Sequence, residues 1–209
     1  MNLTDKASRW DERYSQEDYA FGKEPNEFLQ QQLPELQPIG KILFPADGEG
    51  RNGVFAAKLG WEVSCFDISI EGKKKAEKLS KEQGVQLDYQ IGDINIVDYQ
   101  ESQFDAIGII YAHFGKEDKA YYYSKFNSFL KKGGYVILEV FSKKHIDYVG
   151  RDERVGGPRD LDTLVSIEEI KTYFPDYQII VLEEKEITLK EGLYHIGKGS
   201  VIRFVGRKK

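Results

Sequence analysis

Residues 46–53 read ADGEGRNG and contain the spacing G-x-G-x-x-G, at Gly48, Gly50 and Gly53. The stretch lies between the apolar run KILFP (41–45), a predicted strand, and the helical pattern VFAAKL (54–59). Glycines at such a turn let the backbone approach a ligand closely and direct helix N–H groups at it. Asp67 ends the next predicted strand, where a carboxylate binds ribose hydroxyls. The pattern predicts a nucleoside-type ligand; a structural turn with Asp67 capping a helix is the alternative.

Short apolar runs alternate with helical patterns along the rest of the chain, which is typical of a parallel sheet covered by helices. The last two runs have no helix between them and must pair antiparallel, because a parallel neighbour requires a crossover. We predict an α/β fold with a doubly wound, Rossmann-like, seven-stranded sheet, mostly parallel with an antiparallel C-terminal strand. The predicted strands cover residues 41–45, 61–67, 87–93, 104–111, 135–141, 177–183 and 201–206.

Three further helices are predicted, and the last two carry terminal signals. One is predicted over 71–83. The next has acids at its start and the lysines Lys131 and Lys132 at its end, followed by Gly133 as a left-handed cap. In the third, Ser166 and Glu169 form a capping box, and the helix ends at Pro175. The predicted buried stripe of the middle helix consists of Tyr122, Phe126, Phe129 and Leu130.

Composition limits the class of protein. A chain of 209 residues with 40% hydrophobic content can form one domain, 1–209, in which we expect residues 1–40 to be a helical segment over the cofactor site. The net charge of −5 and the pI of about 5.4 offer no basic surface for nucleic acid. The single cysteine, Cys65, excludes an intramolecular disulfide, and no apolar run is long enough for a signal peptide or a membrane span. We expect a cytoplasmic monomer or homodimer.

A dehydrogenase of the short-chain type is one alternative, since Tyr121 and Lys125 supply its Tyr-x-x-x-Lys spacing. The serine that such an enzyme needs near the end of the fourth strand is missing, because residues 103–123 contain no Ser. The predicted antiparallel hairpin also leaves no second half-domain for a dinucleotide. These two features make an NAD(P)-dependent oxidoreductase the alternative hypothesis and not the first one.

The order of the motifs is more specific. The glycine turn, Asp67, the pair Gly92-Asp93 and the stretch FLKKGGYVILE (129–139) together resemble a class I S-adenosylmethionine-dependent methyltransferase. Within that class, four stretches are similar to the tellurite-resistance and thiopurine methyltransferase group: GEGRN (48–52), AAKLGWEVSCFD (56–67), WDERY (10–14) and GLYHIGKGSVI (192–202). The resemblance implies S-adenosylmethionine as cofactor and a small-molecule acceptor, such as a thiol or a selenium or tellurium oxyanion.

The resemblance also implies roles for residues. Gly48 and Gly50 would approach the methionine part of the cofactor, Asp67 would hold its ribose, and Asp93 with Ile94 would meet its adenine. Because of two departures from the family pattern, a non-catalytic binding module with a nucleotide-binding fold stays as an alternative hypothesis. Phe44 stands where an acid is common and Ala46 where the first glycine is usual, so that Asp47 would stand in through a shifted turn. The expected cofactor set is Ala46, Asp47, Gly48, Glu49, Gly50, Asn52, Asp67, Ile68, Asp93, Ile94 and Tyr111.

Candidates for the acceptor side follow the fourth and fifth strands, because open α/β sheets bind ligands at the carboxyl ends of strands. They are Tyr111, His113 and Phe114, then residues 142–145. His195 precedes the last strand. We take Tyr111, His113 and His195 as catalytic candidates and expect His113, with an ordinary pKa of about 6.5, to orient the acceptor or take its proton. A loop histidine bonded to backbone is the alternative. Histidines 113, 145 and 195 lack metal-ligand spacing, so we predict no metal site.

Two segments are candidates for covering the site. Residues 142–165 are a candidate lid loop, and within them 147–162 should bury little apolar surface and be mobile without ligand. Its arginines Arg151, Arg154 and Arg159 are candidates for binding an anionic acceptor; a solvated linker is the alternative. Near the N-terminus, Tyr19 and Phe21 either cover the cofactor or only attach that segment to the domain.

Overall fold

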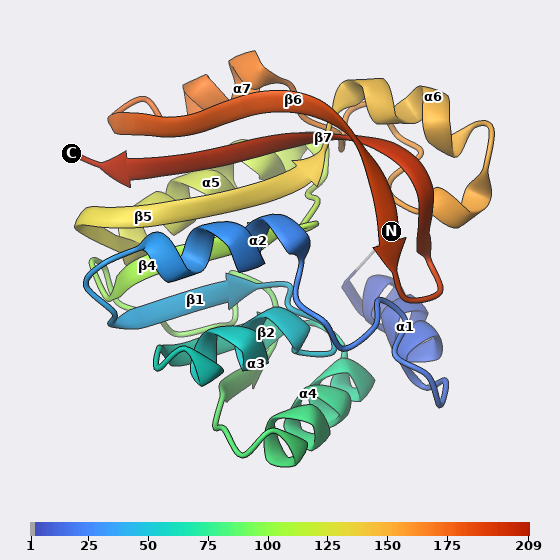
Figure 1. The fold of residues 1–209 in the computed structure, drawn as a ribbon, viewed down its shortest axis with the longest axis horizontal. Helices are drawn as coiled ribbons and strands as arrows, with labels where there is room; N and C mark the ends of the chain where they lie inside the picture. Colours follow the sequence, from blue (N-terminus) through green and yellow to red (C-terminus); the bar gives the residue numbers. More distant parts are fainter. Residues whose placement is uncertain (1–2) are drawn as a thin grey trace.

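A seven-stranded sheet of order β3-β2-β1-β4-β5-β7-β6 runs through the computed structural model, which describes residues 3–209 (Figure 1). Strands β1 to β5 pair in parallel, and β7 is antiparallel to both of its neighbours, β5 and β6. The predicted fold class is confirmed. The strands are β1 (Lys41–Pro45), β2 (Glu62–Asp67), β3 (Asp88–Ile91), β4 (Phe104–Ile110), β5 (Leu130–Phe141), β6 (Tyr177–Glu191) and β7 (His195–Lys208).

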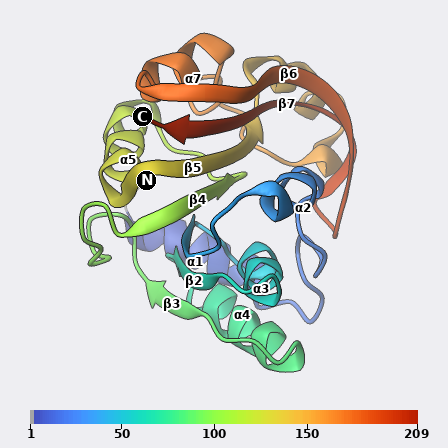
Figure 2. The same cartoon turned by 60° about the vertical axis from the view of Figure 1, so that its left-hand side comes forward.

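Helices cover both faces of the sheet. Helices α2 (Glu27–Gln32), α3 (Arg51–Lys58) and α4 (Ile70–Glu82) pack on one face, and α5 (Lys116–Phe129) and α7 (Ile167–Tyr173) pack on the other (Figures 1 and 2). Helices α1 (Leu3–Tyr14) and α6 (Ile146–Val149) lie beyond the carboxyl ends of the parallel strands (Figure 1). The glycine turn between β1 and α3 therefore lies at the same edge of the sheet as α1 and the end of the β6–β7 hairpin. Within residues 3–209, no helix combines the length and apolar character needed to cross a membrane.

The C-terminal hairpin is longer than the sequence predicted. Its strands pair from Tyr177 opposite Lys208 to Glu191 opposite His195, whereas the prediction stopped at residue 183 and started again at 201. The added part is rich in charge, EEKEITLKE (183–191), and most of its side chains are exposed or half-buried, so it carries no apolar run. Both views show the hairpin curving past the carboxyl edge of the sheet (Figures 1 and 2). His195 is therefore the first residue of a strand and not part of a loop.

The predicted end of α5 is wrong. The helix ends at Phe129 and β5 begins at Leu130, so Lys131 and Lys132 lie on the strand. The cause is a tight approach to β4: Lys131 Nζ binds Asp105 Oδ1 at 2.7 Å, and a Cβ atom on Gly134 would come within 2.9 Å of the Asp105 carbonyl oxygen. The predicted buried stripe is correct at Phe126 and Phe129. Tyr123 takes the buried place expected for Tyr122, which is half-buried.

Two predictions concern residues 142–175. The capping box of α7 is confirmed, with Ser166 Oγ accepting from the Glu169 amide at 3.3 Å, and the helix ends at Tyr173. Within 147–162, Val149 and Val155 are buried against Phe141 of β5, while the other side chains are exposed or half-buried, and Leu164 just beyond joins the same cluster. Segment 142–165 contains α6 and two 3₁₀ turns and is anchored to the sheet. Its mobility without ligand stays a prediction.

The glycine turn packs tightly on α4, and this packing can be measured. Gly50 has φ +82°, and a Cβ atom there would lie 2.5 Å from the Ala76 Cβ. Gly60 has φ +94° with nothing within 4 Å. Gly60→Ala should lose about 1–2 kcal/mol in free energy of unfolding from the left-handed backbone alone. Gly50→Ala should lose a further 1–3 kcal/mol, roughly, from overpacking.

Urea unfolding of the two variants separates the two contributions. Equal losses at Gly50 and Gly60 would show that α4 moves away at little cost and that the turn is not held by this contact.

Candidate functional site

The carboxylate of Asp67 joins the glycine turn to the start of α4. Its Oδ2 accepts from the Gly48 amide at 3.0 Å, and its Oδ1 accepts from the Ser69 amide at 2.9 Å. Burial raises the pKa of Asp67 to about 6, although these amide hydrogen bonds act in the opposite direction. A carboxylate has about four lone-pair sites, so Asp67 keeps acceptor capacity for ribose hydroxyls.

Ala46, one of the two departures from the family pattern, and Asp47, the residue expected to stand in through a shifted turn, take clear positions. Ala46 adopts φ +54° and is exposed, so it occupies the left-handed backbone that a glycine would favour. Asp47 turns toward the start of α3: its Oδ2 accepts from the Gly53 amide at 3.1 Å and lies 3.4 Å from Cys65 Sγ. Burial raises the pKa of Asp47 to about 7. These contacts direct Asp47 to β2, and its role at the methionine amino group stays a prediction.

Residues 19–26 form a segment that we call the strap, and the glycine turn holds it. Glu49 is buried, and its Oε2 accepts from the Ala20 amide at 2.8 Å. Its Oε1 accepts from Lys75 Nζ on α4 at 2.9 Å. The predicted cofactor residue Glu49 therefore attaches the strap and α4 to the turn.

Arg51 and Asn52 hold the rest of the strap. Arg51 Nη1 donates to the Phe21 carbonyl at 3.0 Å, and Asn52 Oδ1 accepts from the Asn26 amide at 3.0 Å. Both side chains are buried. Of the motif GEGRN, the three side chains other than glycine thus contact the strap, and the predicted contact of Glu49 and Asn52 with the cofactor stays a prediction.

Helix α1 also packs on the turn. A Cβ atom on Gly48 would lie 2.6 Å from the Tyr14 hydroxyl, so the phenol rests directly on this glycine. Asp11 Oδ1 accepts from Ser69 Oγ at 2.5 Å and from the Glu71 amide at 3.1 Å. The N-terminal segment therefore lies over the turn and the start of α4, as a cover for the cofactor would.

A buried carboxylate that sequence reasoning missed lies at the centre of the neighbouring region. Glu139 Oε1 accepts from Asn26 Nδ2 at 2.7 Å and from the Tyr111 hydroxyl at 2.9 Å, and its Oε2 accepts from Arg203 Nε at 2.5 Å. Burial, with Glu139 beside it, raises the pKa of Tyr111 well above its ordinary value, so the phenol stays protonated and donates. The signal in the sequence was a single acid within the apolar run YVILEVF (135–141).

A second missed acid, Glu191, orients His195. Nδ1 of His195 lies 2.9 Å from Glu191 Oε2, and Arg51 Nη2 lies 3.1 Å from the same oxygen. Burial alone would raise the pKa of Glu191, but Arg51 and His195 lower it to about 2. Burial lowers the pKa of His195, against the effect of Glu191. The network assigns the proton to Nδ1 and leaves Nε2 as an acceptor.

The structure brings two of the three catalytic candidates together. The rings of Tyr111 and His195 lie 4.6 Å apart, and both contact Phe141. His113 stacks on another side of Phe141, and its Nε2 accepts from the Phe141 amide at 3.3 Å. Burial lowers the pKa of His113 to about 3. This position favours the alternative of a loop histidine bonded to backbone over that of a proton acceptor.

His145 is also held by backbone. Its Nδ1 accepts from the Ser200 amide at 3.3 Å, which leaves Nε2 to donate to the Gly156 carbonyl at 3.0 Å. Each of the three histidines therefore has its own protein partner. In the part of the chain that the structure describes, no group of three or more His, Cys, Asp or Glu side chains could hold a metal ion.

The remaining predicted residues are spread around the edge of the sheet. Asp93 Oδ1 accepts from the Asn95 amide at 2.9 Å, Ile94 is buried in the core, and Ile68 is half-buried after β2. Tyr121 is 45% exposed on α5, with Lys125 Nζ over its ring, so the pair expected of a short-chain dehydrogenase faces solvent.

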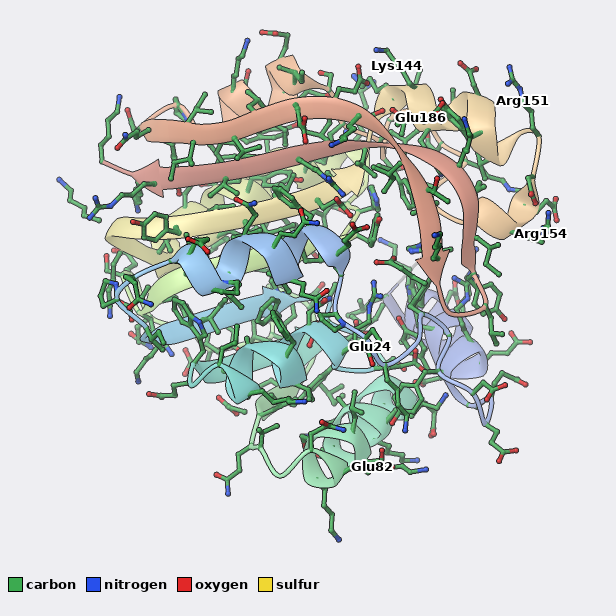
Figure 3. All side chains as sticks on the ribbon, viewed as in Figure 1. Glu24, Glu82, Lys144, Arg151, Arg154 and Glu186 are labelled. Atoms are coloured by element: carbon green, nitrogen blue, oxygen red, sulfur yellow. The ribbon has the colours of Figure 1, made fainter. Side chains whose placement is uncertain are left out.

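A cavity of about 460 Å³ lies between the strap and the hairpin. Residues 21–27 and 185–192 form its walls, and its floor consists of Arg51, Tyr111, Glu139 and Arg203. The three arginines proposed for an anionic acceptor do not line it. Figure 3 shows Arg151 and Arg154 at the outer edge of segment 142–165. Arg154 pairs with Asp152 at 2.8 Å and Arg159 with Glu153 at 2.6 Å, both exposed.

Comparisons with known proteins agree with this geometry. Residues 42–134, less than half of the chain, match a protein-family model described as a methyltransferase domain. No curated protein sequence matches the chain significantly. The match indicates a methyltransferase domain, for which S-adenosylmethionine is the implied cofactor, and the solved structures below share the fold.

Three solved structures illustrate the likeness. One, from work on the conversion of a disulfide bond into a thioacetal group during echinomycin biosynthesis, has a TM-score of 0.76 at 13% identity and covers 98% of this chain and 92% of its own. A SAM-dependent methyltransferase from Anabaena variabilis has a TM-score of 0.69 at 16% identity, and the match covers 100% of this chain and 96% of that protein. TehB from Haemophilus influenzae has a TM-score of 0.68 at 17% identity, and the match covers 98% of this chain and 67% of TehB. At these identities the likeness shows the fold.

The half-buried acid Asp47 should make stability depend on pH in a defined direction. With a folded-state pKa of about 7 against an ordinary value of 3.8, Asp47 holds a proton in the fold that the unfolded chain releases. The free energy of unfolding should therefore fall as pH rises from about 4 to 7. Asp47→Asn should flatten this slope in urea unfolding measured across that range.

Asp105 provides the control of opposite sign. Burial would raise its pKa, but Lys131 and the Lys41 amide lower it, so its contribution is present above pH 4 and lost as pH falls. Asp105→Asn should change only the acid side of the profile. A slope between pH 4 and 7 that Asp47→Asn leaves intact would contradict the assignment.

Proposed function

We propose that this chain, whose residues 42–134 match a methyltransferase domain, transfers a methyl group to a small-molecule acceptor bound between the strap and the hairpin. The observation that carries the proposal is the contact of Asp67 with the Gly48 amide at 3.0 Å. The contact supports the proposal, because a strand-end carboxylate beside a glycine turn can bind ribose hydroxyls where the backbone lets a cofactor approach. S-adenosylmethionine, when bound, supplies a methyl group on a sulfonium.

The acceptor class is the finer part of the proposal. The cavity of about 460 Å³ is of the size that small-molecule sites have. The similarity of GEGRN (48–52) and GLYHIGKGSVI (192–202) to the tellurite-resistance and thiopurine methyltransferase group supports thiols and selenium or tellurium oxyanions as the first acceptors to test. The exposure of Tyr121 argues against the oxidoreductase alternative.

The residues at the cavity can align an acceptor and take its proton. Methyl transfer needs an aligned nucleophile and a site without water. Phe21 and Tyr111 line the cavity, and the buried ring of His195 packs against both from outside the lining, 4.5 Å from Phe21 and 4.6 Å from Tyr111. Nε2 of His195 is the unprotonated nitrogen and would accept the proton, while Glu191 keeps the ring in position.

This assignment predicts different results for the two histidines. His195→Gln should lower the methylation rate of an acceptor that must lose a proton by roughly a hundredfold, the range of general-base catalysis. His113→Gln keeps an acceptor for the Phe141 amide, and its rate should stay near wild type because His113 does not titrate near neutral pH.

The rates are measured as release of S-adenosylhomocysteine across pH. Calorimetry should show that both variants bind S-adenosylhomocysteine within about a factor of two of wild type, roughly 0.4 kcal/mol. A fall in rate for His113→Gln and none for His195→Gln would exchange the two roles.

Asp67→Asn tests the cofactor side. The amide NH₂ cannot accept a hydrogen bond, so it opposes either the Gly48 or the Ser69 amide and removes the charge that favours ribose hydroxyls. Loss of a charge-assisted hydrogen bond costs about 1.5–3 kcal/mol, so S-adenosylhomocysteine should bind roughly ten- to hundredfold more weakly. Asp88→Asn, at the exposed start of β3, is the matched control. An unchanged dissociation constant in a folded Asp67 variant would remove Asp67 from the site.

A further inference from the structure

Arg203 has hydrogen-bonding groups that the protein does not use. It lies on β7, its side chain is only 9% exposed, and its Nε donates to Glu139 Oε2. One face of its guanidinium rests on Phe28, with 4.9 Å from Cζ to the ring centroid. Within residues 3–209, the hydrogen bond of Arg203 to the protein comes from Nε, and its Nη atoms are not sealed from solvent.

These Nη atoms belong to the floor of the cavity. Arg203 lines the space between the strap and the hairpin together with Tyr111 and Glu139. A guanidinium carries five N–H donors, four of them on the Nη atoms. Since the contacts with Glu139 and Phe28 hold the side chain in place, these donors are available to water or to a ligand in the cavity.

Arg203 and Arg51 are the two cations on the floor, and each is paired with an acid, Arg203 with Glu139 and Arg51 with Glu191; they differ in how many of their N–H donors the protein uses. Arg51 is occupied by Glu191 at 3.1 Å and by the Phe21 carbonyl at 3.0 Å. The remaining charges stand on the walls, with both signs present: Lys23, Glu24 and Glu27 on the strap side, and Lys185, Glu186 and Lys190 on the hairpin. The walls therefore carry no net preference, whereas the floor offers a pair of N–H donors.

We propose that Arg203 binds a carboxylate or another oxyanion group of the methyl acceptor through its Nη atoms, so that the enzyme selects negatively charged acceptors. This inference rests on the proposed function. A planar guanidinium binds such groups through two parallel hydrogen bonds, which adds geometry to charge. The reacting atom of the acceptor then lies toward Tyr111, which lines the same cavity and contacts the ring of His195.

Two thiols of similar shape test the selection. 4-Mercaptobenzoate carries the carboxylate, and 4-methylbenzenethiol replaces it by a methyl group. Calorimetry in saturating S-adenosylhomocysteine measures the affinity of each, and methylation assays give KM and kcat. Wild type should bind 4-mercaptobenzoate at least roughly tenfold more tightly, with the difference appearing in KM. Tellurite as competitor distinguishes a small inorganic oxyanion from a carboxylate acceptor.

The variants keep the test independent of folding. Arg203→Met together with Glu139→Gln removes both members of the buried pair, so no charge is left buried alone. Arg203→Lys keeps the charge but lacks the two parallel donors. The preference should vanish in the double variant and shrink in Arg203→Lys. Arg207→Met is the control, because Arg207 lies on the same strand, is exposed and donates to the Gly133 carbonyl; it should keep the preference.

The outcomes separate the inference from the function on which it rests. Equal affinities of the two thiols for wild type, binding of neither, or a preference that survives in the double variant would overturn the role of Arg203. Methylation of both thiols at equal efficiency would do so while the proposed function stands. A carboxylate preference without binding of S-adenosylhomocysteine or methyl transfer would overturn the proposed function and leave Arg203 as an anion-binding residue.

Discussion

The attachment of the strap to the glycine turn is the constraint on which the site depends. Glu49, Arg51 and Asn52 follow one another within four residues, and each holds a backbone group of residues 20–26. All three are buried, so their hydrogen bonds are made away from water, where a lost partner is costly. The turn that would receive the cofactor therefore also positions one wall of the cavity, so the proposed cofactor and acceptor sites would share a single scaffold.

The hairpin completes that scaffold from the far end of the chain. Its curved end brings Glu191 within 3.2 Å of Asn26 Nδ2 and within 3.1 Å of Arg51 Nη2. Buried ion pairs add little net stability, because desolvation offsets the attraction. Their consequence here is positional: they fix His195 and Tyr111 against one another beside the cavity. Gly156 and Gly157 extend this packing, since a Cβ atom on either would come within 3 Å of His195 or His145 and Phe141.

Local signals predicted the fold because each rests on short-range chemistry. The apolar run of β4 reads as a strand buried on both faces, and Ser166 with Glu169 fixes the start of α7. The hairpin was underestimated because its outer half is charged, and α5 was overextended because the contact of Lys131 with Asp105 joins residues 26 apart. The pairs Glu139–Arg203 and Arg51–Glu191 join residues far apart in sequence, so only the closed sheet shows them. His113 lies after β4, as predicted, but its hydrogen-bond partner is the backbone amide of Phe141 on β5, which the sequence does not identify.

Amide hydrogen exchange with and without ligand is the most direct test that the glycine turn is the cofactor site. With S-adenosylhomocysteine, exchange should slow at the turn 46–53, at 67–69 and at 93–95, and also at Ala20, Phe21 and Asn26, because the strap is held by the same turn. NADH should leave all of these amides unchanged. Slowed exchange at the turn with NADH, or protection by S-adenosylhomocysteine confined to other parts of the molecule, would contradict the account.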